Sequence, residues 1–366
     1  MAAEARIDRL DVSAYIIPTD FPEQDGTADW DKTVLVLVQV HGGGRMGLGY
    51  SYADLSTARL IDSSLKTLVE GGDALSVGAA YAAMTKAVRN IGRAGSAAMA
   101  ISAVDAALWD LKARLLDVSL VDLLGRARAG TEAYGSGGFT SYPDDRLAEQ
   151  LGDWADTGLR AVKMKVGRDA RRDVQRVKAA RAAIGPDVEL YVDANGAHGA
   201  KTALAQAEAY AEYCVTWFEE PVSSDDLAGL RLVREQGPAG MRVAAGEYGY
   251  TPWYYSDMLR ERAVDVLQAD ATRCGGVTGF MTAASIAEGC HVPLSAHTAP
   301  SLHARIGAAC RNLINIEYFH DHARIEAMLF DGAAKPDKGL LVADSSSPGL
   351  GLVFKEKDAS RYQHPF

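Results

Sequence analysis

Short apolar segments recur through the second half of the chain, and each ends in a charged or acid–base residue. Seven such segments follow one another at intervals of roughly 20 to 28 residues. A buried parallel strand is an apolar run of about 4 to 8 residues, from which charge is normally excluded. The end residues therefore indicate a function rather than packing. In chain order they are Lys165 with Lys163 before it, Asp193, Glu219, Glu247, Asp270, His297 and Glu317.

A (β/α)₈ barrel explains this pattern, because the active site of such a barrel lies at the C-terminal ends of its strands. Amphipathic helices are predicted between the segments, for example from Arg171 to Ile184 and from Ala200 to Tyr213. Another begins at Thr251-Pro252, a cap followed by proline at the first helical position. Tyr134 to Phe139 is expected to be the first barrel strand. The predicted fold class is α/β, with seven or eight βα units.

The first third of the chain has a different pattern. Ile7 to Ile17 and Thr33 to Val40 are predicted strands. His41-Gly-Gly-Gly44 is a hairpin turn rather than a phosphate loop, because no helix N-terminus follows it. The polar segment from Pro18 to Asp31 is expected to be a mobile loop, and Asp54 to Leu124 has helical spacing. Strands followed by helices indicate an α+β domain.

Domain limits are predicted where these patterns change. We expect an N-terminal domain over residues 1–127, a catalytic barrel over 128–323, and a segment over 324–366 that packs back on the N-terminal domain. Beyond Tyr318 the chain is expected to be irregular as far as Leu350. His320-Asp-His322 is expected to be a loop with hydrogen-bonding roles rather than a metal cluster.

Composition narrows the choice of partners. The net charge of −10 argues against nucleic acid. No run of 18 apolar residues is available to span a membrane, and the first residues lack the regions of a signal peptide. The four cysteines have neither metal nor disulfide spacing, which fits a reducing cytoplasm. A small-molecule substrate is therefore the expected partner.

Three consecutive strands are predicted to end in carboxylates, at Asp193, Glu219 and Glu247. Neighbouring strand ends lie close together in a barrel, so these side chains would repel one another unless a cation binds them. Oxygen ligands, with positions left for water and substrate, suit Mg²⁺. The alternative, a surface-loop position, is plausible for any one of the three acids but much less so for all together.

Two further pairs have acid–base character. Lys163 and Lys165 are two apart on a strand, so both point to the barrel interior. An ammonium beside a second ammonium and a metal ion has a lowered pKa, which makes it usable as a base. Asp270 and His297 end successive strands and could form a dyad in which Asp270 orients the imidazole. We favour catalysis over a structural role for His297.

Glu317 ends the last strand, next to the lysines once the barrel closes. Buried near a substrate carboxylate, it would be protonated and donate a hydrogen bond to an enolate oxygen. The alternative is a salt bridge to Lys163 or Lys165, and spacing alone does not decide between them. We also expect Asn195 to contact the substrate.

The ordered set of motifs resembles the mandelate racemase subgroup of the enolase superfamily. The motifs are KxK at 163–165, DxN at 193–195, EEP at 219–221, GE at 246–247, Asp270 before Gly275-Gly276, SxH at 295–297, and the segment from Ser102 to Lys112. The resemblance implies that the N-terminal domain caps the barrel. Its loops, roughly Pro18 to Asp31 and Tyr50 to Leu60, would determine the substrate. By analogy, the protein would form a homo-oligomer.

The resemblance also implies roles for individual residues. Mg²⁺ would be held by Asp193, Glu219 and Glu247, with Lys165 and His297 as acid–base catalysts. Asp270 would be the partner of His297, Glu317 the electrophile, and Lys163 would help to neutralise the substrate carboxylate. The muconate-lactonising and dipeptide-epimerase branches would carry lysine where this chain has Asp270, which argues against them.

These residues predict Mg²⁺-dependent abstraction of the proton α to a carboxylate, with enediolate stabilisation. Most members of the subgroup act on sugar acids, so dehydration of an aldonate or aldarate to a 2-keto-3-deoxy acid is the first expectation. Racemisation or epimerisation of a 2-hydroxy acid is one alternative, and cycloisomerisation of an anhydro-sugar acid is another. A degenerate ligand-binding barrel is the non-enzyme alternative, which the intact ring of side chains disfavours.

Overall fold

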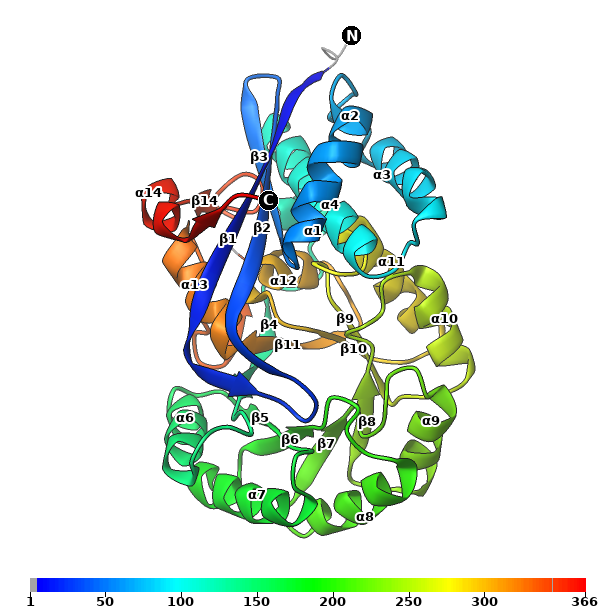
Figure 1. The fold of residues 1–366 in the computed structure, drawn as a ribbon, viewed down its shortest axis with the longest axis vertical. Coiled ribbons are helices and arrows are strands. Elements are labelled where there is room, and N and C mark those ends of the chain that lie inside the picture. Colours follow the sequence, from blue (N-terminus) through cyan, green and yellow to red (C-terminus); the bar gives the residue numbers. More distant parts are fainter. Residues whose placement is uncertain (1–4, 344) are drawn as a thin grey trace.

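Eight parallel strands form a closed barrel in the computed structural model, which describes residues 5–343 and 345–366 (Figure 1). Each strand pairs with the next along the chain, and the last pairs with the first. This confirms the predicted barrel. The strands are β4 (Gly130–Gly137), β5 (Ala161–Lys165), β6 (Glu189–Asp193), β7 (Val215–Glu219), β8 (Arg242–Ala245), β9 (Val266–Ala269), β10 (Leu294–Ala296) and β11 (Leu313–Phe319).

A helix follows every barrel strand, as the alternating pattern predicted. Asp169 caps one of them through its side chain, and Thr251 caps another immediately before Pro252. The helices cover the outside of the barrel with their apolar faces inward. They are α6 (Asp144–Asp156), α7 (Ala170–Ile184), α8 (Ala200–Ala211), α9 (Leu227–Gln236), α10 (Pro252–Arg260), α11 (Gly276–Gly289), α12 (Pro300–Gly307) and α13 (His320–Leu329).

The N-terminal residues form an antiparallel sheet packed on helices. Its order is β15-β1-β2-β3, and β2 and β3 join through the predicted hairpin turn at Gly43 and Gly44. The long helix α4 lies across β2 and β3. The elements are β1 (Ile7–Gln24), β2 (Asp29–Gly42), β3 (Arg45–Tyr52), α1 (Leu55–Leu60), the π-helical turn Ile61–Leu65, α2 (Lys66–Val69), α3 (Val77–Ala87), the 3₁₀ turn Val88–Asn90, α4 (Ser96–Leu115) and α5 (Leu120–Leu124).

The segment from Pro18 to Asp31 is a β-hairpin, and its prediction as a mobile loop was wrong. Strand β1 continues to Gln24, and β2 begins at Asp29. A register shift between Pro18 and Glu23 accommodates the extra residues as a bulge. Phe21 and Trp30 then pack edge-on against aromatic rings of the barrel, Tyr142 and Phe139 respectively. These tertiary contacts stabilise a strand that the local sequence does not favour.

The tip of this hairpin is fixed against the barrel strand ends. In Figure 1 the blue hairpin extends from the N-terminal sheet across the opening of the barrel. A Cβ on Gly26 would lie 2.2 Å from the Ala194 carbonyl oxygen, so only glycine allows this approach. Arg168 donates to the carbonyl oxygens of Asp25 and Ala28, at 2.6 and 2.8 Å. The hairpin therefore covers the C-terminal ends of the barrel strands.

The chain just beyond β11 is regular, contrary to the sequence prediction, because α13 begins at His320 and the short strand Phe330–Asp331 follows it. Residues 332–339, which come next, lie outside any helix or strand, as predicted. His320-Asp-His322 is the first turn of α13 and not a loop, although all three side chains do make hydrogen bonds. The last strand, β15, pairs with Ala14 and Tyr15 of β1, whereas β13 pairs with β4 of the barrel. The remaining elements are β12 (Phe330–Asp331), β13 (Leu340–Val342), β14 (Val353–Phe354), α14 (Glu356–Ala359), the 3₁₀ turn Ser360–Tyr362 and β15 (Gln363–His364).

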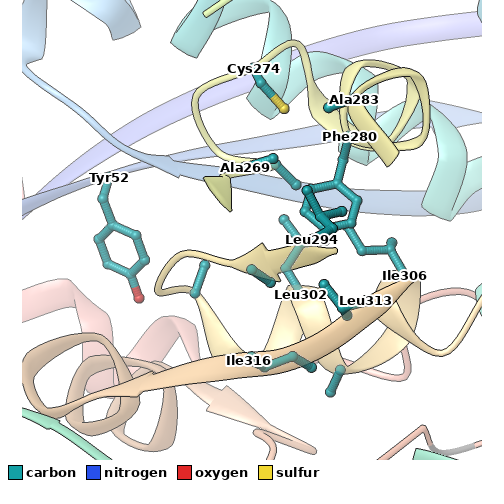
Figure 2. Close-up of a cluster of buried hydrophobic side chains, with 14 of the residues drawn as sticks. Tyr52, Ala269, Cys274, Phe280, Ala283, Leu294, Leu302, Ile306, Leu313 and Ile316 are labelled. Atoms are coloured by element: carbon teal, nitrogen blue, oxygen red, sulfur yellow. The ribbon is translucent and has the colours of Figure 1, made fainter. Parts of the chain in front are cut away.

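Two large apolar clusters lie between the barrel strands and their covering helices, one along β5 to β7 and the other along β8 to β11. Figure 2 shows Phe280 of α11 directed into a group that includes Leu294 of β10 and Ile306 of α12. The four cysteines are free thiols, two of them buried. Within the described residues, no helix has the length and apolar character needed to cross a lipid bilayer.

Helix α4 joins the N-terminal sheet to the barrel through buried polar side chains. Ser102 accepts a hydrogen bond from the backbone N–H of Gly275 at 2.8 Å. Asp105 accepts from the N–H and hydroxyl of Thr278, at 2.9 and 2.6 Å. Both helix residues are fully buried. The N-terminal domain is thus attached to the loop that leaves β9 and carries Asp270.

Candidate active site

The acidic ends of β6, β7 and β8 converge, as the sequence predicted. Asp193 is paired in register with Lys165 on one side and with Glu219 on the other. Glu247 follows Gly246, whose backbone passes so close to β9 that a Cβ would lie 2.2 Å from a carbonyl oxygen. One carboxylate oxygen from each acid lies within 4.8 Å of those of the other two, and all three residues are buried.

The donor set fits a hard divalent cation. Its three ligand groups are carboxylates, which Mg²⁺ prefers. Glu247 Oε2 is buried and has no hydrogen-bond partner among the described residues. Burial and repulsion from Asp193 raise the pKa of Glu219 well above its ordinary value. Both observations indicate that Glu247 and Glu219 lack enough positive charge nearby to stabilise their ionised forms.

A count of charges supports the same conclusion. Among the described residues at the strand ends, carboxylates outnumber the Lys and Arg side chains paired with them by six to three. Buried carboxylates are costly unless paired or bound to a metal. The carboxylates are Asp193, Glu219, Glu220, Glu247, Asp270 and Glu317, and the cations are Lys163, Lys165 and Arg273.

Both lysines of β5 point into the barrel and are held by carboxylates. Lys165 Nζ lies 2.5 Å from Asp193 Oδ2, and Lys163 Nζ lies 2.8 Å from Glu317 Oε1. Burial is the largest single effect and would lower the pKa of Lys165, but the carboxylates of Asp193, Glu247 and Glu317 together raise it. The lowering expected beside a bound metal ion stays a prediction. Lys163 is fully buried beneath these groups.

Asp270 and His297 form the predicted pair. His297 Nδ1 lies 2.8 Å from Asp270 Oδ2, while Asp270 Oδ1 accepts from the N–H and hydroxyl of Thr272, both at 2.7 Å. Burial is the largest single effect and opposes ionisation of Asp270, but the hydrogen bond with His297 and the nearby charges of His297 and Arg273 together lower the pKa of Asp270. The carboxylate thus stays charged and holds the imidazole, with Nε2 3.4 Å from Glu247 Oε2.

Replacing either member of this pair should cost most of the activity. We expect Asp270→Asn and His297→Asn each to lower kcat by about 10²- to 10⁴-fold, the usual contribution of a general acid–base group. Because Asp270 acts through His297, the double variant should lose little more than either single one. Steady-state kinetics of the three proteins tests this, with the exposed His291→Asn as a control. Losses that multiply would contradict a single unit.

Glu317 is an ion-paired carboxylate, which is the alternative that the sequence left open. Its Oε1 accepts from Ser136 at 2.6 Å, and its Oε2 accepts from the backbone N–H of Thr298 at 3.0 Å. Burial is the largest single effect and favours the neutral acid, but Lys163, His297 and Lys165 together lower the pKa of Glu317. The protonated, hydrogen-bond-donating form expected from the sequence is not supported.

A cavity of about 240 Å³ lies over these groups. The barrel side is lined by expected residues: Lys165, Asn195, Glu247, His297 and Glu317. Sequence reasoning did not single out the rest of the lining, although Asp25 and Trp30 lie in the expected specificity loop. These residues are Asp25, Trp30 and Thr33 of the hairpin, with Tyr248, Arg273, Thr298, Phe319 and His322. An open groove of about 660 Å³ shares Asn195 and Tyr248 with the cavity.

Arg273 is the missed residue closest to the chemistry. Its Nη1 lies 3.3 Å from Glu247 Oε1, and its Nε lies 3.6 Å from Asp270 Oδ2. Its guanidinium stacks over the ring of Tyr248. Arg273 thus links one of the three clustered acids to the dyad. Its position in the first turn after β9 is the only local signal in the sequence.

Comparison with known proteins assigns the chain to a family. Residues 13–125 match the N-terminal domain of the mandelate racemase / muconate lactonizing enzyme family, and residues 146–358 match the enolase C-terminal domain-like family. The chain belongs to this family. It is an enzyme of the enolase superfamily, in the mandelate racemase subgroup that the motifs indicated.

Relatives within this superfamily cover nearly the whole chain. A 3,6-anhydro-alpha-L-galactonate cycloisomerase of Streptomyces coelicolor is 33% identical over 95% of this chain and 96% of its own. An arabinonate dehydratase of Saccharolobus solfataricus is 30% identical over 83% and 82%. A mandelate racemase/muconate lactonizing enzyme-like protein from Rubrobacter xylanophilus has a TM-score of 0.96 at 54% identity, covering 98% of this chain and all of its own. A racemase from Streptomyces coelicolor with bound magnesium has a TM-score of 0.92 at 29% identity, covering 98% and 100%.

Proposed function

We propose that this protein is a Mg²⁺-dependent sugar-acid dehydratase that removes the proton α to the substrate carboxylate. The observation that carries the proposal is one small cavity with three features. Its wall includes one acid of a buried triad, and an amine and an imidazole open into it. Such a set suits a reaction in which charge develops beside a carboxylate. Relatives that dehydrate a sugar acid, and one that holds magnesium, support the same choice.

The metal would be held by Asp193, Glu219 and Glu247. When bound, Mg²⁺ supplies positive charge next to the substrate carboxylate. Lys163 offsets part of the remaining negative charge of Glu219 and Glu317. The fully buried position of Lys163 suits this role better than direct contact with the substrate.

Proton transfer belongs to Lys165 and His297. Lys165 can take a proton only after losing its own, and its ion pair with Asp193 opposes that loss. A metal bound to Asp193 would weaken this ion pair, and Lys165 could then act as a base. Asp270 holds His297 through Nδ1. The other ring nitrogen, Nε2, can accept the α-proton or donate one to a departing β-hydroxyl.

Cycloisomerisation of an anhydro-sugar acid is the second candidate. The cycloisomerase of Streptomyces coelicolor is 33% identical to this chain along nearly its whole length. The same proton abstraction would start both reactions, and the position of the leaving group would separate them. Racemisation or epimerisation of a 2-hydroxy acid would use the same two bases without loss of a group.

A panel of sugar acids tests this proposal. The enzyme with Mg²⁺ should exchange the α-proton of at least one aldonate, aldarate or anhydro-aldonate in D₂O, as measured by NMR. The proposed dehydration predicts that a 2-keto-3-deoxy acid accumulates, which semicarbazide detects. Exchange with isomerisation alone would favour the second candidate. Absence of exchange across the panel would contradict both.

A further inference from the structure

The cavity has two walls of different chemistry. The barrel wall carries the reacting groups, among them Lys165 and His297. The opposite wall is formed by Asp25, Trp30 and Thr33 of the β1–β2 hairpin. A substrate held by its carboxylate at the barrel wall must direct the rest of its chain towards the hairpin. The charge of this far wall therefore selects the substrate's tail.

The permanent cations that line the cavity, within the part of the chain that the structure describes, are Lys165 and Arg273. Lys165 belongs to the reacting wall and pairs with Asp193 at 2.5 Å. Arg273 is occupied by Glu247 and by Asp270, at 3.3 and 3.6 Å. Both cations therefore belong to the barrel wall, and the described hairpin residues that line the cavity include no Lys or Arg.

Among the described residues, the lining also contains two histidines, His297 of the dyad and His322. The His322 ring stacks on Tyr52 with the ring centroids 3.4 Å apart, and His322 is 7% exposed. Burial holds the pKa of His322 well below its ordinary value, so the imidazole is neutral. It can exchange hydrogen bonds with hydroxyl groups, but it supplies no charge.

Asp25 gives the far wall a negative charge. Its Oδ1 accepts from the backbone N–H groups of Thr27 and Ala28, at 2.6 and 2.7 Å, which fixes the side chain at the hairpin tip. No Lys, Arg or His lies within ion-pair distance of this carboxylate among the described residues, and Oδ2 makes no hydrogen bond to them. Asp25 is 7% exposed. An oxygen held in this way can accept a hydrogen bond from a substrate hydroxyl.

We propose that Asp25 is a specificity-determining residue that selects monocarboxylates with a neutral, hydroxylated tail and excludes dicarboxylates. This inference rests on the proposed function, since it takes the first carboxylate to be at the metal. A second carboxylate would face Asp25 at a wall whose described lining residues include no Lys or Arg. Like charges in such a site repel strongly. Hydroxyl groups instead find acceptors in Asp25, and partners in Thr33 and His322.

The test compares matched pairs of acids, each a hexonate and the hexarate of the same configuration. Isothermal titration calorimetry with Mg²⁺ measures binding, and α-proton exchange measures reaction. Wild-type enzyme should bind the best hexonate at least about tenfold more tightly than its hexarate. Asp25→Asn keeps the size and one acceptor oxygen, and should reduce this preference at least threefold. Asp31→Asn, an exposed change on the same hairpin, should leave it unaltered.

Two results would overturn the inference. One is a hexarate that binds wild-type enzyme as tightly as its hexonate or more tightly. The other is a preference that Asp25→Asn leaves unchanged while the variant still binds hexonates. Binding with the expected preference but without α-proton exchange would contradict the proposed reaction and support the charge selection. The two proposals therefore fail in distinguishable ways.

Discussion

Removal of Mg²⁺ should abolish turnover, and removal of one carboxylate ligand should do the same without unfolding the protein. We expect EDTA to lower activity at least about 10⁴-fold and added Mg²⁺ to restore it, because the proposed reaction develops charge beside the substrate carboxylate. Glu219→Gln should be as inactive as the EDTA-treated enzyme. A neutral amide, like the protonated acid that the raised pKa of Glu219 favours, does not repel Asp193, so the metal-free variant should be no less stable than metal-free wild type.

Thermal unfolding separates this result from damage to the fold. A ligand that binds only the folded protein raises the melting temperature with its concentration. Mg²⁺ should therefore stabilise wild type and the exposed control Glu208→Gln, and should fail to stabilise Glu219→Gln. Full activity in EDTA would contradict the metal assignment. So would an unchanged Mg²⁺ response in Glu219→Gln.

The pH dependence of the stability of the metal-free protein should also report on Glu219. The pKa of Glu219 is raised in the folded state, so the metal-free fold retains a proton there that the unfolded chain releases near its ordinary pKa. Its contribution to stability is therefore full below about pH 4.5 and declines as the pH rises above that value. Glu219→Gln should remove this part of the decline.

The site could be predicted from the sequence because strand ends are a local signal. An apolar run that ends in a charge identifies both the strand and the direction of its last side chain. The register Lys165–Asp193–Glu219 then follows from the parallel order of the barrel. The pairing of Asp270 with His297 was predictable for the same reason, since β9 and β10 are neighbours.

Features that depend on tertiary contacts were not predictable in this way. The hairpin from Pro18 to Asp31 is held by Trp30 against Phe139 and by Arg168, all distant or unmarked in the sequence. The ionisation of Glu317 depends on its distance from Lys163, which no spacing provides. The resemblance placed Asp25 in a specificity loop, but nothing in the sequence singled it out, because its position in the lining depends on the fold of the hairpin. The division at residues 1–127, 128–323 and 324–366 stays a proposal, as do the homo-oligomer and the cytoplasmic location.

Lys165 and His297 should act on opposite faces of the substrate. Lys165 ends β5 and His297 follows β10, and these strands are three steps apart through β4 and β11. Each step in an eight-stranded barrel is about 45°, so the two groups are separated by roughly 135° around the axis. Both line the same cavity. A substrate fixed at the metal would then have one base on each side of its α-carbon.

Residual α-proton exchange in D₂O should reveal these two sides. Lys165→Ala should lose exchange with substrates of one α-configuration by at least about 10³-fold and keep it with the other, since each base serves one face. His297→Asn should show the opposite preference. The measurement is NMR of the α-proton with both epimers of one acid and Mg²⁺, with Lys178→Ala, an exposed change on α7, as a control for the lysine. If both variants lost exchange with the same epimer and kept it with the other, one base would serve the reaction alone. The second group would then act only as the acid that protonates the departing hydroxyl.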